Sequence, residues 1–181
     1  MPLVSDSRLL ARVADGDSRA FNRLVEHHSQ RVLNVIYRIV LSRSDAEDLC
    51  QDVFVRLWKQ APDWQDDAKV STWLHRVASN LAINHSQRVQ QRQIVDSELT
   101  EQLLEGQRDE ADDEANALSE KMMAALSSLP AEQRAAMAFR YYRDLPVKQI
   151  ADILDSSPKA VESLLGRARK QLKQVLGESD D

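Results

Sequence analysis

Cationic side chains crowd onto one short stretch near the carboxyl end of the chain. Residues 158–175 hold five basic side chains and one acid, although the 181-residue protein carries a formal net charge of −5. The basic residues are Lys159, Arg167, Arg169, Lys170 and Lys173. Such groups bind nucleic acids because each phosphate that they neutralise releases condensed counterions. The stretch is therefore either a solvated helix face or a surface that binds a polyanion.

A second set of polar side chains recurs at every fourth residue in the middle of the chain. This donor stripe consists of Arg76, Asn80, Asn84 and Arg88. Residues four apart share one face of a helix. Residues 68–95 contain four basic residues and no acid, whereas a solvated face normally mixes both signs. The stripe therefore favours a ligand rich in hydrogen-bond acceptors.

Three tryptophans surround the loop that precedes this stripe. Trp58 and Trp73 fall on apolar helix faces, so we expect both in the core, and Trp64, in "PDWQDD", less so. Donors beside exposed aromatic rings suit single-stranded nucleic acid, whose bases can stack or be flipped into a pocket.

The residues that catalysis or metal binding would need are missing or poorly placed. The chain has no Gly-rich phosphate loop and no HExxH motif. A metal-dependent enzyme would have to use His27, His28, His75 and His85. His28 falls on an apolar stripe and the other three on polar faces, without acids at ligand spacing. We therefore expect no metal, no cofactor and no enzymatic activity.

The composition predicts an all-α protein. Four glycines, five prolines and nine aromatic residues leave little material for tight turns and short strands. Apolar residues recur at spacings of three and four, which is the helical period. Asp17 is placed to cap a first long helix, and "SDAE", with Ser44 as the cap, to start the next. Cys50, the only cysteine, is expected to pack as a small apolar residue in a reducing cytosol.

Charge divides the helical chain into two domains. Residues 96–120 hold ten acids and one arginine, between two basic segments. We interpret residues 1–95 as one small helical domain, 96–117 as an acidic flexible linker, and 118–181 as a second small helical domain. No stretch approaches 18 uninterrupted apolar residues, and a secretory signal is not apparent, so we expect a cytoplasmic protein without a membrane span.

The last two predicted helices have the helix-turn-helix pattern. "VKQIADIL" is a short helix, "DSS" a turn, and Pro158 begins a longer helix. The start of the second helix reads base edges in such motifs. Lys159 can donate to guanine, and Glu162 can accept from a cytosine amino group. Gly166, in mid-helix, is explained by a close approach of either a neighbouring helix or a phosphate backbone.

Three blocks together resemble the bacterial extracytoplasmic-function (ECF) sigma factors of the sigma-70 family. They are "DAEDLCQDVFVRLWK", "STWLHRVASNLAINHSQR" and the stretch from "LSSLPAEQR" to "GRARKQL". The resemblance implies an initiation subunit of core RNA polymerase whose first domain is sigma region 2 and whose second is region 4. It also implies two further partners, promoter DNA and an anti-sigma factor.

The resemblance assigns roles to three groups of residues. Docking on the clamp helices of the polymerase β′ subunit falls to Asp45, Glu47, Asp48, Gln51, Asp52 and Arg56. Binding and melting of the −10 element falls to Trp64, Lys69, Trp73, Arg76, Asn80, Asn84 and Arg88. Binding of the −35 element falls to Ser157, Pro158, Lys159, Ala160, Glu162, Ser163, Arg167, Arg169 and Lys170. Region 4 would also contact the β flap.

A second hypothesis is a helix-turn-helix regulator that binds duplex DNA without polymerase. It explains the second domain but leaves the acidic face of residues 45–56 and the donor stripe without a role.

The length of the linker is relevant to the sigma-factor hypothesis. A coil of 22 residues spans about 26 Å on average. Two DNA elements one or two turns apart require about 35–70 Å, so a sigma factor would need its linker held stretched.

Overall fold

The computed structural model describes residues 5–97 and 113–177. Within these ranges the chain is helical and has no strand, so the all-α prediction is confirmed. The amino-terminal half contains α1 (Asp6–Ala14), α2 (Ser18–Val40), α3 (Arg43–Gln60), the short 3-10 helix η1 (Ala61–Asp63) and α4 (Val70–Ser97). The carboxyl-terminal half contains α5 (Asp113–Ser127), α6 (Ala131–Met137), the π-helical turn η2 (Ala138–Tyr142), α7 (Val147–Ile153) and α8 (Pro158–Leu176). Most of the expected linker, 96–117, lies outside the described residues.

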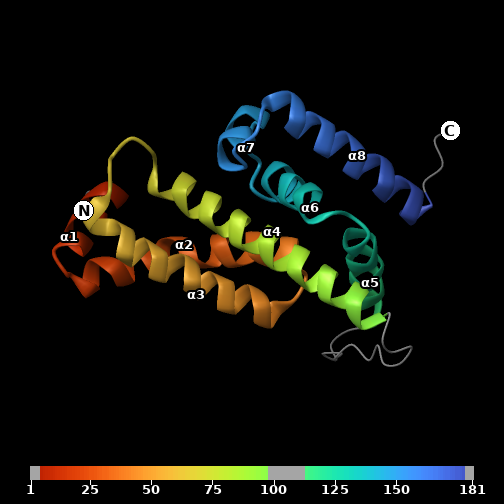
Figure 1. The fold of residues 1–181 in the computed structure, drawn as a ribbon, viewed down its shortest axis with the longest axis horizontal. Coiled ribbons are helices and arrows are strands. Elements are labelled where there is room, and N and C mark those ends of the chain that lie inside the picture. Colours follow the sequence, from red (N-terminus) through yellow and green to blue (C-terminus); the bar gives the residue numbers. More distant parts are fainter. Residues whose placement is uncertain (1–4, 98–112, 178–181) are drawn as a thin grey trace.

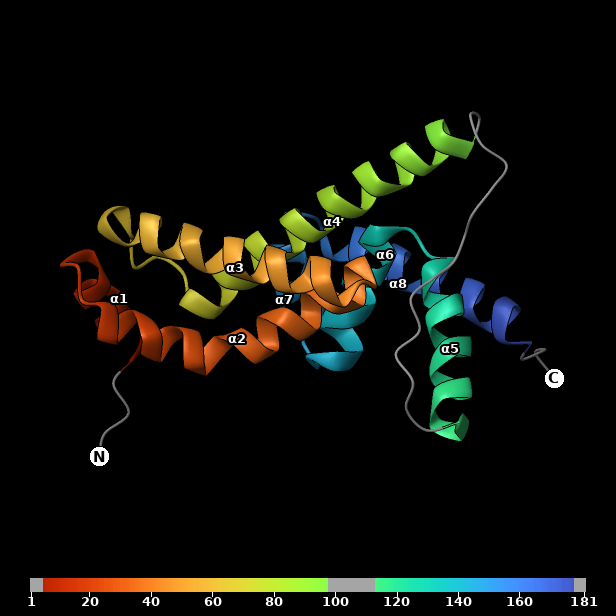
Figure 2. The same ribbon diagram turned by 90° about the horizontal axis from the view of Figure 1, so that it is seen from below.

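The helices α2, α3 and α4 form a bundle that α1 and η1 close at one end (Figure 1). Asp17 caps α2 as predicted, since its carboxylate accepts hydrogen bonds from the backbone N–H groups of Arg19 and Ala20. These bonds lower the pKa of Asp17, the one to Ala20 most. The buried residues of the bundle include Leu24, Val35, Ile36, Ile39, Val53, Leu57, Leu74 and Ala78. The carboxyl-terminal half of α4 continues beyond this bundle (Figure 2).

The start of α3 differs from the prediction. Ser42 caps this helix, not Ser44, and its hydroxyl accepts from the N–H of Asp45 at 3.4 Å. The reason is that Leu41 adopts a left-handed conformation (φ 60°), which ends α2 and lets the next helix begin at once. Glu47 therefore cannot close a capping box and pairs with Arg43 at 3.0 Å.

The carboxyl-terminal half contains the predicted helix-turn-helix. Asp144 (φ 51°) ends the helical run that begins with α6, and Asp155 (φ 50°) forms the turn between α7 and α8. Ser157 caps α8, its hydroxyl accepting from the N–H of Ala160 at 3.1 Å. Val161, Leu165 and Ala168 are buried, whereas Val175 is 46% exposed, because the packed face of α8 ends before its last turn.

The two halves pack against each other. Helix α6 contacts α2 and α4, and α7 contacts α4. Figure 1 shows α6 and α7 beside α4, and α8 on the far side of α6. Buried side chains from both halves form one hydrophobic cluster. The expected division at residues 95 and 118 stays a prediction.

Candidate nucleic-acid interface

The donor stripe lies on the surface of α4. Arg76, Asn80, Asn84 and Arg88 are all exposed, which agrees with the sequence pattern. Arg76, the first residue of the stripe, already makes a hydrogen bond within the protein. Its guanidinium Nη2 donates a hydrogen bond of 2.9 Å to the backbone carbonyl of Asp152 in α7. The stripe therefore touches the helix-turn-helix at its amino-terminal end.

A pocket of about 330 Å³ opens where the loop after η1 meets α4. Trp64, from the loop after η1, lines it together with Trp73 and Arg76, which both belong to α4. The two indoles meet edge to face, with centroids 6.1 Å apart and planes at 72°. The Nε1 of Trp64 is buried and has no hydrogen-bond partner among the described residues. The pocket thus offers aromatic surface and a cation at the start of the stripe.

The same pocket carries negative charge that the sequence analysis did not use. Asp63 and Asp67 line it together with Gln60, Gln65 and Thr72. Carboxylate and amide oxygens accept hydrogen bonds from exocyclic amino groups of bases. A bond of 2.9 Å from the hydroxyl of Ser7 to Asp66 ties α1 to this loop. Lys69 is exposed, but it does not line the pocket.

Two tryptophans occupy environments that differ from those expected. Trp58 is 38% exposed and packs mainly edge to face on Phe21, with centroids 5.1 Å apart. Its predicted burial was wrong because it lies toward the outer face of α3, beside the exposed Lys59. Trp64 and Trp73 are both half-buried, so Trp64 is less exposed than "PDWQDD" indicated.

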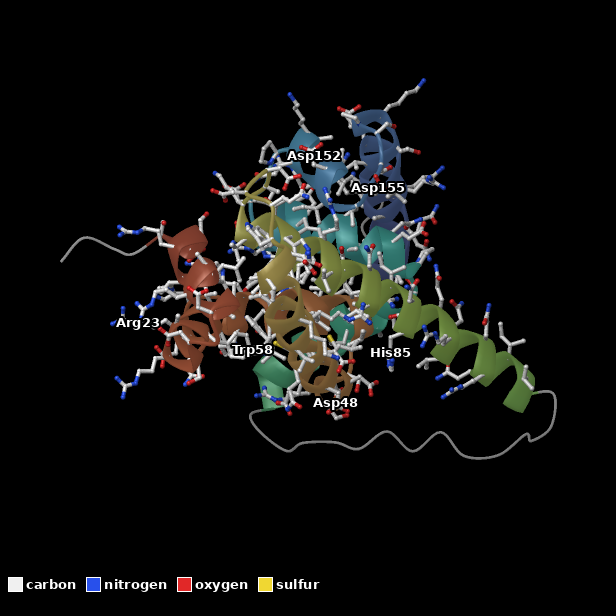
Figure 3. The ribbon with its side chains drawn as sticks, turned by 60° about the vertical axis from the view of Figure 1, so that its left-hand side comes forward. Arg23, Asp48, Trp58, His85, Asp152 and Asp155 are labelled. Carbon is white, nitrogen blue, oxygen red and sulfur yellow. The ribbon has the colours of Figure 1, made fainter. Side chains whose placement is uncertain are left out.

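The outer face of α3 carries the acids expected there. Glu47, Asp48, Gln51, Asp52 and Arg56 are exposed. Asp45 is half-buried, and its carboxylate lies 3.2 Å from Nε2 of His85, in an alignment that makes no hydrogen bond. Sequence reasoning missed an apolar component, since Val55 is 50% exposed near Trp58. In Figure 3, Asp48 and Trp58 lie on the opposite side of the molecule from Asp152 and Asp155.

The outer face of α8 is cationic. Of the nine residues expected to bind DNA here, all are exposed except Ala160, which is half-buried. Ser157 uses its hydroxyl as the helix cap. Arg169 donates to the Tyr141 hydroxyl at 2.9 Å, and this tyrosine, 57% exposed, was missed from the sequence. Apart from the adjoining residues and backbone of α8 itself, no heavy atom of the described residues lies within 4 Å of the position that a Cβ on Gly166 would occupy, so no helix in the described part of the chain explains this glycine.

His75 contradicts its expected place on a polar face. It is 6% exposed, and its ring meets Phe139 edge to face at 5.5 Å. Burial, first, and then the charges of Arg143, His28 and Arg31 lower the pKa of His75 to about 4. The error arose because the residue that covers His75 belongs to the other half of the chain.

His28 and Cys50 are both buried. His28 is buried as predicted, with Nε2 2.8 Å from the carboxylate of Asp6. Burial raises the pKa of the Cys50 thiol to about 11, which fits a small packed residue.

In the described parts of the chain, no three His, Cys, Asp or Glu residues are grouped as metal ligands. A search of the same parts finds no helix long and apolar enough to cross a membrane.

Comparison with known proteins decides the family. Residues 24–93 match the family Sigma-70 region 2, and residues 119–172 match Sigma-70, region 4. The ECF RNA polymerase sigma-E factor of Escherichia coli strain K12 is 30% identical, over 93% of each chain. The chain belongs to the ECF sigma factors. The RNA polymerase sigma-H factor of Pseudomonas aeruginosa is 29% identical over 94% of this chain and 93% of its own.

Two solved structures share the fold of this chain. CnrH, in complex with the cytosolic domain of CnrY, is 23% identical with a TM-score of 0.70 and covers 97% of this chain and 99% of its own. RpoE of Bartonella quintana, with the anti-sigma factor NepR, is 19% identical with a TM-score of 0.69, over 88% and 98%. In this sigma factor the donor stripe and the aromatic pocket therefore lie in region 2, and the helix-turn-helix lies in region 4.

Proposed function

We propose that this sigma factor directs core RNA polymerase to promoters with two spaced elements and helps to open their DNA. One observation carries the proposal: the donor stripe of α4 leads into a pocket walled by Trp64, Trp73 and Arg76. A row of donors ending in an aromatic pocket suits one DNA strand whose last base is flipped out of the stack.

Opening of the −10 element would need no catalysis. Unstacking a base costs a few kcal/mol, and binding the flipped base can offset that cost. Asn80 and Asn84 would hold the strand along α4, and Arg88 and Lys69 would contact phosphates. The chain would thus act as an initiation factor without enzymatic activity or a cofactor.

Region 4 would read the −35 element through the start of α8. Lys159 and Glu162 are exposed in its first turns, where a recognition helix meets base edges. Ala160 can contact a thymine methyl group. Arg167, Arg169 and Lys170 lie further along the helix, where phosphate contacts fix its orientation. The β flap of polymerase would hold this domain in place.

The outer face of α3 would bind the clamp helices of the β′ subunit. Exposed acids beside Val55 and Trp58 combine charge complementarity with an aromatic anchor, which is the composition of binding hot spots. An anti-sigma factor would be a further partner. The similar structure of RpoE is a complex with the anti-sigma factor NepR, and that of CnrH is a complex with the cytosolic domain of CnrY. The chain would act in the cytoplasm, where core polymerase is found.

The proposal is tested by replacing Arg76 and Asn80 together with alanine. On a promoter mapped by run-off transcription, we expect open-complex formation to fall on duplex template and less on premelted template. The matched control replaces Asn22 and Arg23, an exposed Asn–Arg pair on α2 that does not line the pocket. Equal opening by the double variant and wild type on both templates would overturn the assignment of α4.

A further inference from the structure

Two arginines near His75 have no partner for their positive charges among the described residues. Arg143, which follows η2, is half-buried, and its Nε is buried without a hydrogen-bond partner in the described parts of the chain. Arg31, on α2, is exposed, and its side chain likewise makes no hydrogen bond or ion pair with the residues that the structure describes. Buried donors in native proteins are nearly always paired with a protein group, a water or an ion. The Nε of Arg143 therefore calls for an acceptor that the described residues do not supply.

The packing of η2 on α2 brings the two arginines toward each other. Tyr142, directly before Arg143, accepts a hydrogen bond of 2.8 Å from Nδ2 of Asn34. Its ring also lies 3.7 Å from the guanidinium carbon of Arg38. Arg31 precedes Asn34 by three residues, so both lie on the same face of α2. The turn that carries Arg143 thus packs against the face of α2 that carries Arg31.

His75 of α4 forms the buried side of this group. It is 6% exposed, and its ring meets Phe139 of η2 edge to face at 5.5 Å. Burial, first, and then the charges of Arg143, His28 and Arg31 lower the pKa of His75 to about 4. The ring is therefore neutral at neutral pH and keeps one N–H donor. Arg31, His75 and Arg143 together are called here the arginine–histidine cluster.

Two acids near the cluster contact other residues. The carboxylate of Asp6 lies 2.8 Å from Nε2 of His28. Asp144, next to Arg143 in the chain, has a side chain that is 96% exposed and lies 3.6 Å from Nη1 of Arg140. An uncompensated charge held partly out of water is costly, and two like charges near each other add to that cost. The cluster is therefore a place where an anion is stabilised.

We propose that the arginine–histidine cluster binds a phosphate group carried by a small molecule. Guanidinium groups donate to phosphate oxygens in a fixed, bidentate geometry. A phosphate has acceptors for both arginines and for the N–H of His75, and its charge offsets theirs. None of the three residues was assigned to core polymerase or to the −35 element, and none lines the aromatic pocket apart from α4 being shared. The site thus goes beyond the proposed function.

The burial of the cluster favours a small molecule over a nucleic acid. His75 and the Nε of Arg143 are buried, and Arg31 is exposed at the surface of α2. A ligand that uses all three must reach inward from α2 toward α4, beside η2. The backbone of a nucleic acid suits an exposed basic face, such as the outer face of α8.

NMR titration of the full chain with inorganic phosphate at pH 7.5 and constant ionic strength tests the site. We expect the ring resonances of His75 to shift and to saturate as one phosphate binds. Arg143→Gln and Arg31→Gln each remove one charged donor and should weaken phosphate binding by about ten- to a hundredfold. Arg140→Gln, from the same turn as Arg143, and Arg23→Gln, from the exposed face of α2, are the matched controls and should bind as wild type does.

Urea unfolding gives a second measurement that does not depend on one resonance. Phosphate should raise the free energy of unfolding of wild type and of both controls with a saturating dependence on its concentration. Arg143→Gln and Arg31→Gln should show little of this gain. The proposal is overturned if chloride at equal ionic strength acts as phosphate does, or if these two variants gain as much as their controls.

A single-stranded oligonucleotide without a terminal phosphate distinguishes the sources of the phosphate group. In the same NMR titration it should leave the shift of His75 by inorganic phosphate unchanged. Displacement of phosphate by the oligonucleotide would overturn the assignment of a small molecule, because the cluster would then bind a nucleic-acid backbone. These outcomes do not depend on promoter opening, so they stand apart from the test of the proposed function.

Discussion

Acid should weaken this protein through His75, and the structure sets both the sign and the window. In the folded chain the pKa of His75 is lowered to about 4, against 6.5 when exposed. The ring is enclosed by Phe139 and faces the positive charges of Arg143 and Arg31 and the ring of His28. A histidine with a depressed pKa stays neutral in the fold, while the unfolded chain takes up a proton first. Its contribution to stability is therefore present above pH 6.5 and is lost as pH falls from 6.5 toward 4.

The size of the effect follows from these two pKa values. Between pH 7.5 and pH 5.0 the free energy of unfolding should fall by about 2 kcal/mol from His75 alone. The lowered pKa of Asp17 acts outside this window, because a carboxylate of depressed pKa loses its contribution only as pH falls below its ordinary value of 3.8. The loss between pH 6.5 and 5.0 is therefore not due to Asp17.

Urea unfolding at pH 7.5 and 5.0 measures this loss. His75→Leu removes the titrating group and keeps the site apolar, so its free energy of unfolding should depend less on pH by about 2 kcal/mol. Asn22→Leu is the control, since Asn22 is exposed on α2, does not titrate, and its replacement should keep the full wild-type dependence on pH. The reasoning is refuted if His75→Leu loses as much stability as wild type between the two pH values.

Three further changes test the local structure by thermal or urea unfolding. Gly166→Ala should raise the free energy of unfolding by about 1 kcal/mol, because the added methyl group enters open space; a loss would show that the helix is constrained there. Ser157→Ala should cost about 1 kcal/mol by removing the cap on the N–H of Ala160, and no loss would contradict that cap. Phe139→Ala should lower the free energy of unfolding by about 3–5 kcal/mol and increase the radius of gyration measured by X-ray scattering. A compact variant of near wild-type stability would contradict a core shared by the two halves.

The sequence was sufficient where the determinant is local. Helical spacing predicted an all-α chain, Asp17 was recognisable as a cap, and "DSS" before Pro158 marked the helix-turn-helix. The donor stripe also followed from spacing alone, since all four members lie on one exposed face. Each of these features depends on residues within a few turns of one another.

The sequence was insufficient where the determinant is distant. His75 is buried by Phe139, which lies 64 positions further along the chain, so its own helix gave no sign of the partner. The start of α3 was missed because a left-handed Leu41, which has no side-chain signal, ends the preceding helix. The pocket of Trp64 and Trp73 depends on how the loop folds back on α4.

Run-off transcription with core polymerase on sheared genomic DNA, with and without the chain, tests the central claim most directly. The account predicts new start sites that share two elements at a constant spacing and that depend on Arg76 and Asn80. If core polymerase initiates at the same sites in both reactions, and does not co-elute with the chain, promoter recognition through region 2 is contradicted.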